Sequence, residues 1–216
     1  MVVGAPAEWI DLIDPMVPVI LSLVVTSWEE MPAQAADETE DNITLLLCRK
    51  LRQNKKAREL PFQIRPQLVE LDPMPDSGAE LGRMDLVFIP RTDDEDIYFC
   101  LESKRLNVVK DGTPRSYASE YVNAGMIRFI TGQYSKAVRH GGMLAYVLDG
   151  DVSRAISNVE ANIRLKYAAL CMSAPGALVR SGILANDDRA SETYHKRAHE
   201  TELFRMHHLF MANSIA

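Results

Sequence analysis

The sequence predicts an α/β fold (α+β) in which helices flank a central mixed β-sheet. Short apolar runs of strand length alternate with helical patterns, in the order helix, three strands, helix, strand, helix, strand. Apolar residues make up 47% of the chain, which is enough for a sizeable core. The 216 residues match the usual size of one domain. We assign residues 1–36 to an N-terminal helical extension and residues 37–216 to the main domain.

The N-terminal extension contains an apolar helical stretch over residues 8–30, broken near Pro15 and Pro18 and followed by a linker over residues 31–36. Its apolar run over residues 17–25 is far shorter than the roughly 20 residues of a membrane span. We therefore predict a buried or partner-facing helix and no membrane association.

Charge and cysteine usage favour a cytoplasmic protein. No basic segment of the signal-peptide type begins the chain, and the cysteines (Cys48, Cys100 and Cys171) lack the CxxC spacing of metal or redox sites. The net charge of −6 excludes a general nucleic-acid-binding protein, because phosphate binding depends on Lys and Arg. Basic residues do cluster over residues 49–58 and 104–115, where they could hold a phosphate backbone. The first cluster equally fits cations that complement a helix C-terminus.

The other elements follow from helical spacing, from alternation of apolar residues and from turn residues. Asp37 or Thr39 is expected to cap the first helix of the domain, and Asp151 a later one. We predict helices over residues 37–58, 116–135 and 151–172; strands or extended segments over 61–71, 84–89, 97–104, 143–148 and 201–211; a charged turn over 91–96; and loops over 72–82, 107–114 and 173–191.

Charged residues interrupt two neighbouring strands. Asp85 lies inside the strand that begins at Met84, whereas Glu102 and Lys104 end the next strand. Charged residues are rarely buried without a partner or a metal ion. Glu102 and Lys104 share a strand face because they are two residues apart. If Pro90 pairs with Ile97 in an antiparallel hairpin, Asp85 lies directly opposite Glu102, with the two Cβ atoms ~5 Å apart.

This arrangement favours metal-assisted cleavage of phosphodiesters. Two carboxylates so close together repel each other unless a cation lies between them. Oxygen ligands suit a hard cation such as Mg²⁺, which activates water and neutralises charge on the phosphate. A nearby lysine can orient or deprotonate that water, or hold the phosphate.

Asp85 followed by Glu102-Ser103-Lys104 on the next strand resembles the PD-(D/E)XK motif of restriction-endonuclease-like nucleases, with a methionine where the family has proline. The helix, three strands, helix, strand order over residues 37–150 also resembles that superfamily's αβββαβ core. The resemblance implies that Asp85, Glu102 and the backbone carbonyl of Ser103 bind Mg²⁺, for which Mn²⁺ can substitute. It also implies that Lys104 positions the attacking water.

The same resemblance implies a glutamate on the first core helix. Glu40, rather than Glu38 or Asp41, shares the face of Ile43 and Leu47, so we predict that Glu40 joins the catalytic and metal-binding set. The alternative is that the acidic stretch only complements the helix N-terminus.

Two further groups of polar residues have competing interpretations. The resemblance also implies a polar or basic residue on the helix after the motif, where Arg128 and Gln133 are predicted to contact the phosphate or the scissile site; the alternative is that they are simply solvated. His195 and His199 have a legal zinc spacing, but neither a nearby cysteine nor an HExxH motif accompanies them, which favours satisfied or exposed histidines. His208 is expected in a core strand.

These observations predict a Mg²⁺-dependent endonuclease that acts on DNA, with a role in defence against foreign DNA suggested by the resemblance. Because the chain has no separate basic DNA-binding domain, sequence recognition would come from a homodimer or from another subunit of a larger complex. The alternative is a catalytically silent scaffold or regulatory subunit. The intact set Asp85, Glu102 and Lys104 favours the enzyme, since a silent copy need not keep all three.

Overall fold

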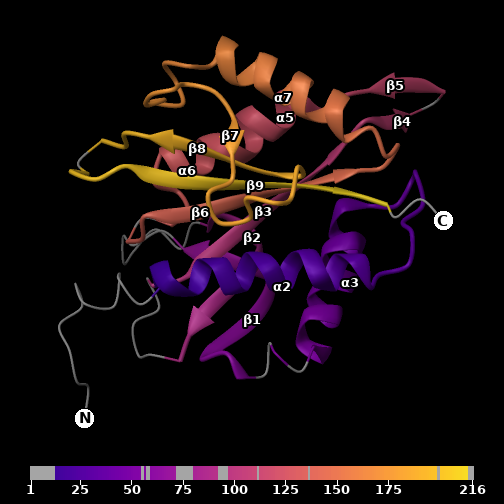
Figure 1. Cartoon of the computed structure of the whole chain (residues 1–216), viewed down its shortest axis with the longest axis horizontal. Helices are drawn as coiled ribbons and strands as arrows, with labels where there is room; N and C mark the ends of the chain where they lie inside the picture. The colour runs from indigo at the N-terminus through magenta and orange to yellow at the C-terminus, as the bar shows by residue number, and fades with distance from the viewer. Residues whose placement is uncertain are drawn as a thin grey trace.

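Helices cover both faces of a mixed β-sheet in the computed structural model of the chain (Figure 1). The predicted α/β class is therefore confirmed. The structure describes residues 13–54, 56, 59–71, 80–91, 97–110, 112–135, 137–198 and 200–213.

The elements have the following bounds. The helical segments are η1 (Asp14–Met16), α2 (Val17–Glu29), α3 (Glu40–Gln53), α5 (Ala118–Glu120), the π-helix η2 (Tyr121–Met126), α6 (Ile127–Ile130) and α7 (Val152–Leu165). The strands are β1 (Phe62–Leu71), β2 (Glu80–Pro90), β3 (Phe99–Leu106), β4 (Val108–Lys110), β5 (Thr113–Arg115), β6 (His140–Val147), β7 (Val179–Arg180), β8 (Ala190–His195) and β9 (Phe204–Ala212).

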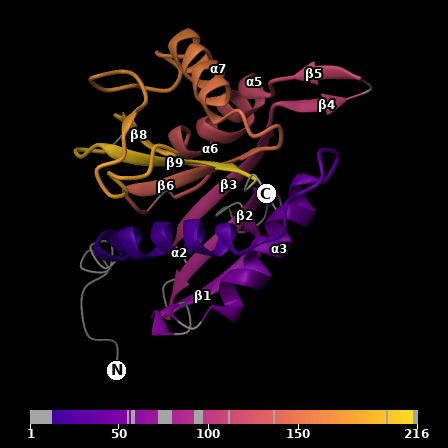
Figure 2. The same ribbon diagram turned by 45° about the vertical axis from the view of Figure 1, so that its right-hand side comes forward.

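Seven of the described strands form one sheet in the order β1-β2-β3-β6-β9-β8-β7, while β4 and β5 form a separate hairpin. The β3–β6 and β6–β9 pairs are parallel and the other neighbours are antiparallel. Helices α2 and α3 lie on one face of the sheet, and α5, α6 and α7 lie on the other (Figures 1 and 2). Among the described residues, no helix is both long and apolar enough to cross a lipid bilayer.

Helix α2 covers one face of the sheet and buries one of its sides in the core. Its Trp28 ring stacks on Tyr146 of β6, with centroids 5.4 Å apart and an interplanar angle of 9°. Trp28 Nε1 donates to the carbonyl of Ala212 at 2.7 Å. The apolar run of the N-terminal extension therefore packs against the sheet of the main domain.

The two helices for which the sequence predicts a cap, α3 and α7, both have one. Thr39 Oγ1 accepts a hydrogen bond from the amide three residues ahead at 3.3 Å, so Thr39 and not Asp37 caps α3. Asp151 Oδ1 caps α7 in the same way at 3.0 Å. The helices end at Gln53 and Leu165, earlier than predicted, and the helix predicted over residues 116–135 ends at Ile130.

Two predicted loops were wrong because they contain strands. Residues 107–114 include most of the β4–β5 hairpin, which turns at Gly112 with a φ of +72°. Residues 173–191 include β7 and the start of β8. Strand β8 buries Thr193 and Glu192, so it lacks the alternation of apolar and polar residues by which a strand is predicted from sequence.

Some expectations lie outside the described residues: residues 8–12 of the first helical stretch, residues 72–79 of a loop, residues 92–96 of the charged turn, and His199.

The register of β2 and β3 agrees with the sequence prediction. Leu86 pairs with Leu101 and Val87 with Cys100 in the antiparallel ladder. Leu86 and Leu101 pack in the cluster that includes α2 and α3, whereas Val87 and Cys100 pack in the opposite cluster. Continued by one residue, the same register sets Asp85 opposite Glu102.

Candidate active site

Asp85 lies where the β2–β3 ladder ends. Its Oδ2 accepts two hydrogen bonds from Ser103 of β3, from the backbone N–H and from Oγ, both at 2.7 Å. The side chain therefore takes the place that a strand carbonyl would have in a continued ladder. This contact fixes the carboxylate of Asp85 against the motif strand.

Glu102 is a buried carboxylate with only one of its oxygens paired. The residue is 1% exposed. Its Oε1 accepts from Lys104 Nζ at 2.9 Å and from Arg128 Nη1 at 2.7 Å. Its Oε2 is buried without a hydrogen-bond partner among the described residues. Burial, together with the nearby negative charge of Asp85, raises the pKa of Glu102 to about 7.

Lys104 is the cation on which the site converges. Its Nζ donates to Ser103 O at 2.6 Å, to Glu102 Oε1 at 2.9 Å and to Glu40 Oε1 at 3.0 Å. Burial acts to lower the pKa of Lys104, but the carboxylates of Glu102, Glu40 and Asp85 raise it overall. The lysine is therefore a protonated ammonium at neutral pH.

Glu40 reaches the site from α3, as predicted. Besides its ion pair with Lys104, its Oε2 accepts from the Arg105 amide at 3.0 Å, which anchors the start of α3 to β3. Burial raises the pKa of Glu40. The competing residues lie elsewhere: Glu38 accepts from the amide of Thr39, and Asp41 is exposed.

Arg128 extends the site along α6. In addition to its bond to Glu102, its Nη1 donates to Tyr134 Oη at 2.9 Å, and its guanidinium lies 5.5 Å from the centre of the Tyr134 ring. Tyr134 Oη in turn donates to the carbonyl of Arg83 on β2 at 2.8 Å. The Arg128 side chain is 32% exposed, so part of it faces solvent beside Glu102.

Gln133 lies against β2 rather than among the residues that converge on Lys104. A Cβ at Gly82 would stand 2.4 Å from Gln133 Nε2 and 2.8 Å from Tyr134 Oη. Glycine at this position therefore allows the segment after α6 to approach the strand that carries Asp85.

The hydroxyl groups of Thr44 and Tyr146, which lie behind the motif strand, were missed by sequence reasoning. Thr44 Oγ1 lies 3.0 Å from Ser103 Oγ and 2.9 Å from Tyr146 Oη. It also donates to the carbonyl of Glu40 at 2.9 Å. Thr44 stands four residues after Glu40 and so shares its helix face, which is the one signal that could have indicated it.

The π-helix η2 brings the following helix close to the motif strand. A Cβ at Gly125 would stand 2.4 Å from Met143 Cε and 3.8 Å from Glu102 Cγ. Single π-turns within helices often occur at functional sites. Here the wider turn and the glycine precede Arg128 by one turn of helix and set its approach to Glu102.

The oxygen atoms present suit a hard cation, but they do not form a complete metal site. In the part of the chain that the structure describes, no three His, Cys, Asp or Glu side chains are arranged to hold a metal ion. Three of the four predicted ligands (Glu40, Glu102 and the Ser103 carbonyl) instead surround the ammonium of Lys104. The unpaired Glu102 Oε2 next to Asp85 is the feature that fits a cation, because a buried carboxylate oxygen needs a partner.

Two of the histidines belong to a hydrogen-bonded chain in the core. His195 Nδ1 lies 2.8 Å from the Leu170 carbonyl, which can only accept, so Nδ1 carries the hydrogen. His195 Nε2 then accepts from Thr193 Oγ1 at 2.7 Å, and Thr193 accepts from His208 Nε2 at 2.8 Å. His208 Nδ1 accepts from Tyr121 Oη at 2.8 Å. His195 is therefore satisfied, and the prediction of His208 in a core strand is confirmed.

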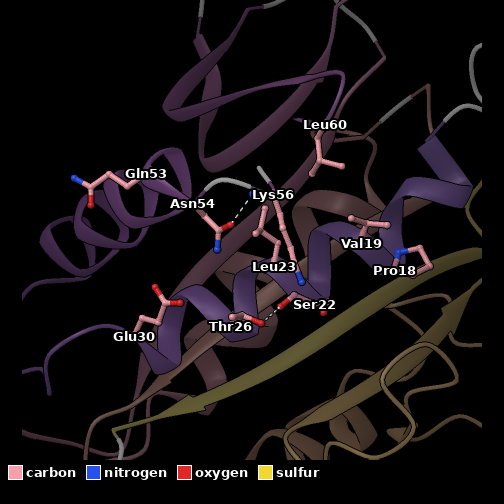
Figure 3. Close-up of a pocket in the computed structure, with 10 residues that line it drawn as sticks. All are labelled: Pro18, Val19, Ser22, Leu23, Thr26, Glu30, Gln53, Asn54, Lys56 and Leu60. Carbon is pink, nitrogen blue, oxygen red and sulfur yellow. Dashed lines mark hydrogen bonds between the residues drawn. The ribbon is translucent and has the colours of Figure 1, made fainter. Parts of the chain in front are cut away.

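The large cavity of about 780 Å³ shown in Figure 3 is separate from these residues. It lies between the outer side of α2 and the C-terminal end of α3. The residues that line it are Pro18, Val19, Ser22, Leu23, Thr26, Glu30, Gln53, Asn54, Lys56 and Leu60. None of the predicted site residues lines it, so we place the chemistry at Glu102 and not here.

Comparisons with protein-family models, with curated proteins and with solved structures find no match for this chain. Its function is therefore argued from the site itself.

Proposed function

We propose that this protein is a metal-dependent nuclease that hydrolyses phosphodiester bonds in DNA. The observation that carries the proposal is the buried Glu102, whose unpaired Oε2 lies next to a second carboxylate and beside two cations. Buried carboxylates with strongly shifted pKa values are concentrated at functional sites. The combination of two carboxylates, a lysine and an arginine suits a reaction at a phosphate.

Asp85, Glu102 and the Ser103 carbonyl, with Glu40 beside them, are the groups that would hold the metal ion. A divalent cation bound there supplies positive charge opposite the phosphate and makes a coordinated water more acidic. Glu102 would ionise beside such a cation, because the attraction of the positive charge opposes the burial and the repulsion from Asp85 that raise its pKa.

Lys104 acts in this proposal as a cationic hydrogen-bond donor rather than as a base, because its raised pKa keeps it protonated at neutral pH. In this structure the ammonium donates its three hydrogens to Ser103 O, Glu102 Oε1 and Glu40 Oε1. A metal ion held by these oxygens would take over some of them, and the hydrogens so released would orient the attacking water and neutralise charge on the phosphate. Glu40 is a positioning residue, since it holds Lys104 Nζ from α3. The partly exposed guanidinium of Arg128 is placed to bind a phosphate oxygen, for which arginine is well suited.

The bond changes are those of hydrolysis. The water oxygen forms the new bond to phosphorus and gives up a proton to solvent, the bond from phosphorus to the leaving sugar oxygen breaks, and that oxygen takes up a proton. The products are a phosphomonoester, which carries the negative charge, and a neutral alcohol, so the reaction requires no redox partner.

One observation favours the alternative of a catalytically silent scaffold. Lys104 already bridges Glu40 and Glu102, and buried ion-pair clusters of this kind also occur as structural elements. A role in defence follows from the resemblance alone, whereas assembly as a homodimer or within a larger complex follows from the lack of a separate basic DNA-binding domain in the sequence; both are parts of the proposal.

The test is cleavage of plasmid DNA by the purified chain in Mg²⁺, Mn²⁺ or EDTA. We expect cleavage with either metal and none with EDTA. Glu102→Gln should abolish cleavage, whereas Glu160→Gln, on the distant face of α7, should cleave like the wild type. Absence of cleavage by the wild type with every metal, on DNA and RNA substrates, would refute the nuclease and favour the scaffold.

A further inference from the structure

The β4–β5 hairpin continues the motif strand beyond the body of the protein. It begins two residues after β3 ends and projects at the edge of the fold in both views (Figures 1 and 2). Lys110 stands six residues after Lys104, which limits their separation to about 20 Å at the rise of an extended chain. The hairpin is therefore within reach of any long polymer bound at the candidate site.

The base of the hairpin is held firmly. Asn107 and Tyr117 flank it, and both have left-handed backbones, with φ of 54° and 52°. The Asn107 amide donates to Ser116 O at 3.2 Å and closes the hairpin. Asn107 Nδ2 donates to Asp149 Oδ1 at 3.1 Å. Such a base fixes the direction in which the hairpin points, as a preformed binding element requires.

One face of the hairpin is polar and basic. Lys110 pairs with Thr113, and Val108 pairs with Arg115. The two members of a pair lie on the same face of the ribbon, and so do residues two apart along one strand, so these four residues share one face. Lys110, Thr113 and Arg115 are all exposed on that face. Among the described residues, neither the Lys110 nor the Arg115 side chain has an ion pair or a hydrogen bond. A hollow of about 510 Å³ lies along this face, and its lining residues are Lys110, Thr113, Arg115, Ser116, Tyr117 and Glu120.

The charge of the hollow suits a polyanion. Among the described residues that line it, two cations face one carboxylate, that of Glu120, and the other three carry hydroxyl groups that can donate to phosphate oxygens. The hollow also reaches the helical run that carries Arg128, because Glu120 at the end of α5 lines it. Glu120 and Arg128 stand eight residues apart on the continuous run α5–η2–α6, about 12 Å along a helix axis. Phosphates that follow one another along a strand could therefore contact both Arg128 and the hollow.

We propose that the basic face of the β4–β5 hairpin binds the phosphate backbone of duplex DNA next to the position cleaved at Glu102. This inference rests on the proposed nuclease function and names the element that holds its substrate. A two-stranded ribbon fits the major groove of B-DNA, which is why duplex DNA is the expected occupant. The acidic net charge of the whole protein is no obstacle, because the cations that bind the phosphates are local.

The test measures binding without cleavage. Affinity for a short labelled DNA duplex is followed by fluorescence anisotropy in EDTA over a range of salt concentrations. The proteins compared are the wild type, the double variant Lys110→Ala/Arg115→Ala, and the control Arg164→Ala/Lys166→Ala. The control removes the same charge from the exposed end of α7.

Each lost phosphate contact should reduce the slope of log affinity against log salt by about 0.9, which corresponds to roughly 8-fold in affinity at 0.1 M salt. We expect the hairpin variant to lose two such contacts and the control none. Glu120→Gln should bind duplex DNA more tightly than the wild type, because it removes the carboxylate found among the described residues of the hollow. In Mg²⁺, the hairpin variant should show a raised KM and an unchanged kcat.

The outcomes separate this inference from the proposed function. If the wild type cleaves DNA and the hairpin variant binds like the control, the hairpin proposal is wrong and the nuclease stands. If the wild type binds DNA through the hairpin but never cleaves it, the nuclease is wrong and the DNA-binding surface stands. A loss confined to single-stranded DNA, or a fall in kcat with KM unchanged, would also overturn the hairpin proposal.

Discussion

Replacing Glu102 by glutamine should make the stability of the protein less dependent on pH. The folded state holds a proton on Glu102 more tightly than the unfolded state, because its pKa rises from 4.5 to about 7. The resulting stability is fully present below about pH 4.5 and is lost as the pH rises through 7. At about 1.36 kcal/mol for each tenfold change in proton affinity, this loss amounts to roughly 3 kcal/mol.

The measurement is urea unfolding of wild type and Glu102→Gln at pH 5 and pH 8, without metal ions. Relative to the wild type, the variant should become more stable by roughly 2–3 kcal/mol between the two pH values. The amide keeps an oxygen that can accept from Lys104 and Arg128, so the remaining difference between the two proteins is similar at both pH values. Asp41→Asn, which removes an exposed carboxylate from the same helix terminus as Glu40, serves as the control. An equal pH dependence in wild type and Glu102→Gln would refute a pKa of about 7 for the buried carboxyl of Glu102.

Metal addition extends the same experiment. Mg²⁺ at ten times its Kd should stabilise the wild type by about 1.4 kcal/mol at pH 8, because it binds only the folded state. Glu102→Gln and Asp85→Asn should lose this response. If the response survives in both variants, the ion binds elsewhere.

Three further predictions concern Lys104, Glu40 and the buried histidines. Lys104→Ala should lower cleavage at least ~10²-fold, because the protonated amine acts on the charge that develops in the transition state; equal initial rates for variant and wild type would exclude this role. Glu40→Gln should reduce cleavage far more than Asp41→Asn, since only Glu40 holds Lys104, and comparable losses in a plasmid assay would instead indicate a general charge effect. Burial lowers the pKa of His195 to about 4 and that of His208 to about 3, so the unfolded chain binds more protons below pH 6.5 and stability should fall as the pH drops from 6.5. Urea unfolding should show a loss of about 2 kcal/mol for each histidine at pH 5, and an unchanged pH dependence in His195→Gln would contradict the interpretation.

Local patterns were sufficient to predict the strands that carry the site. The register of β2 against β3 follows from one pairing at their turn, because each later pair is fixed by counting along both strands. The shared face of Glu102 and Lys104 follows in the same way. The choice of Glu40 over its acidic neighbours needed only helical spacing, and its contact with Lys104 agrees with that choice.

What sequence could not supply depends on contacts between distant segments. The hairpin was taken for a loop because its strands are only three residues long, which is too short to show an alternating pattern. Strand β8 was missed because Thr193 and His195 are buried through hydrogen bonds rather than through apolar side chains. The link from Arg128 through Tyr134 to β2 joins residues more than forty positions apart, which no local periodicity reports.

The state of Glu102 also bears on the choice between enzyme and scaffold. A scaffold gains nothing from a carboxylate with an unpaired oxygen in a buried position, because an apolar residue of similar volume there is often neutral or stabilising. Lys104 and Arg128 both donate to Oε1 of Glu102, and neither donates a hydrogen bond to Oε2. Asp85, held beside it by Ser103, adds repulsion instead of compensation. The unpaired oxygen and the repulsion from Asp85 lower the stability of the folded state, and a bound cation would remove this cost. Residues that lower stability in this way are expected where they serve binding and chemistry.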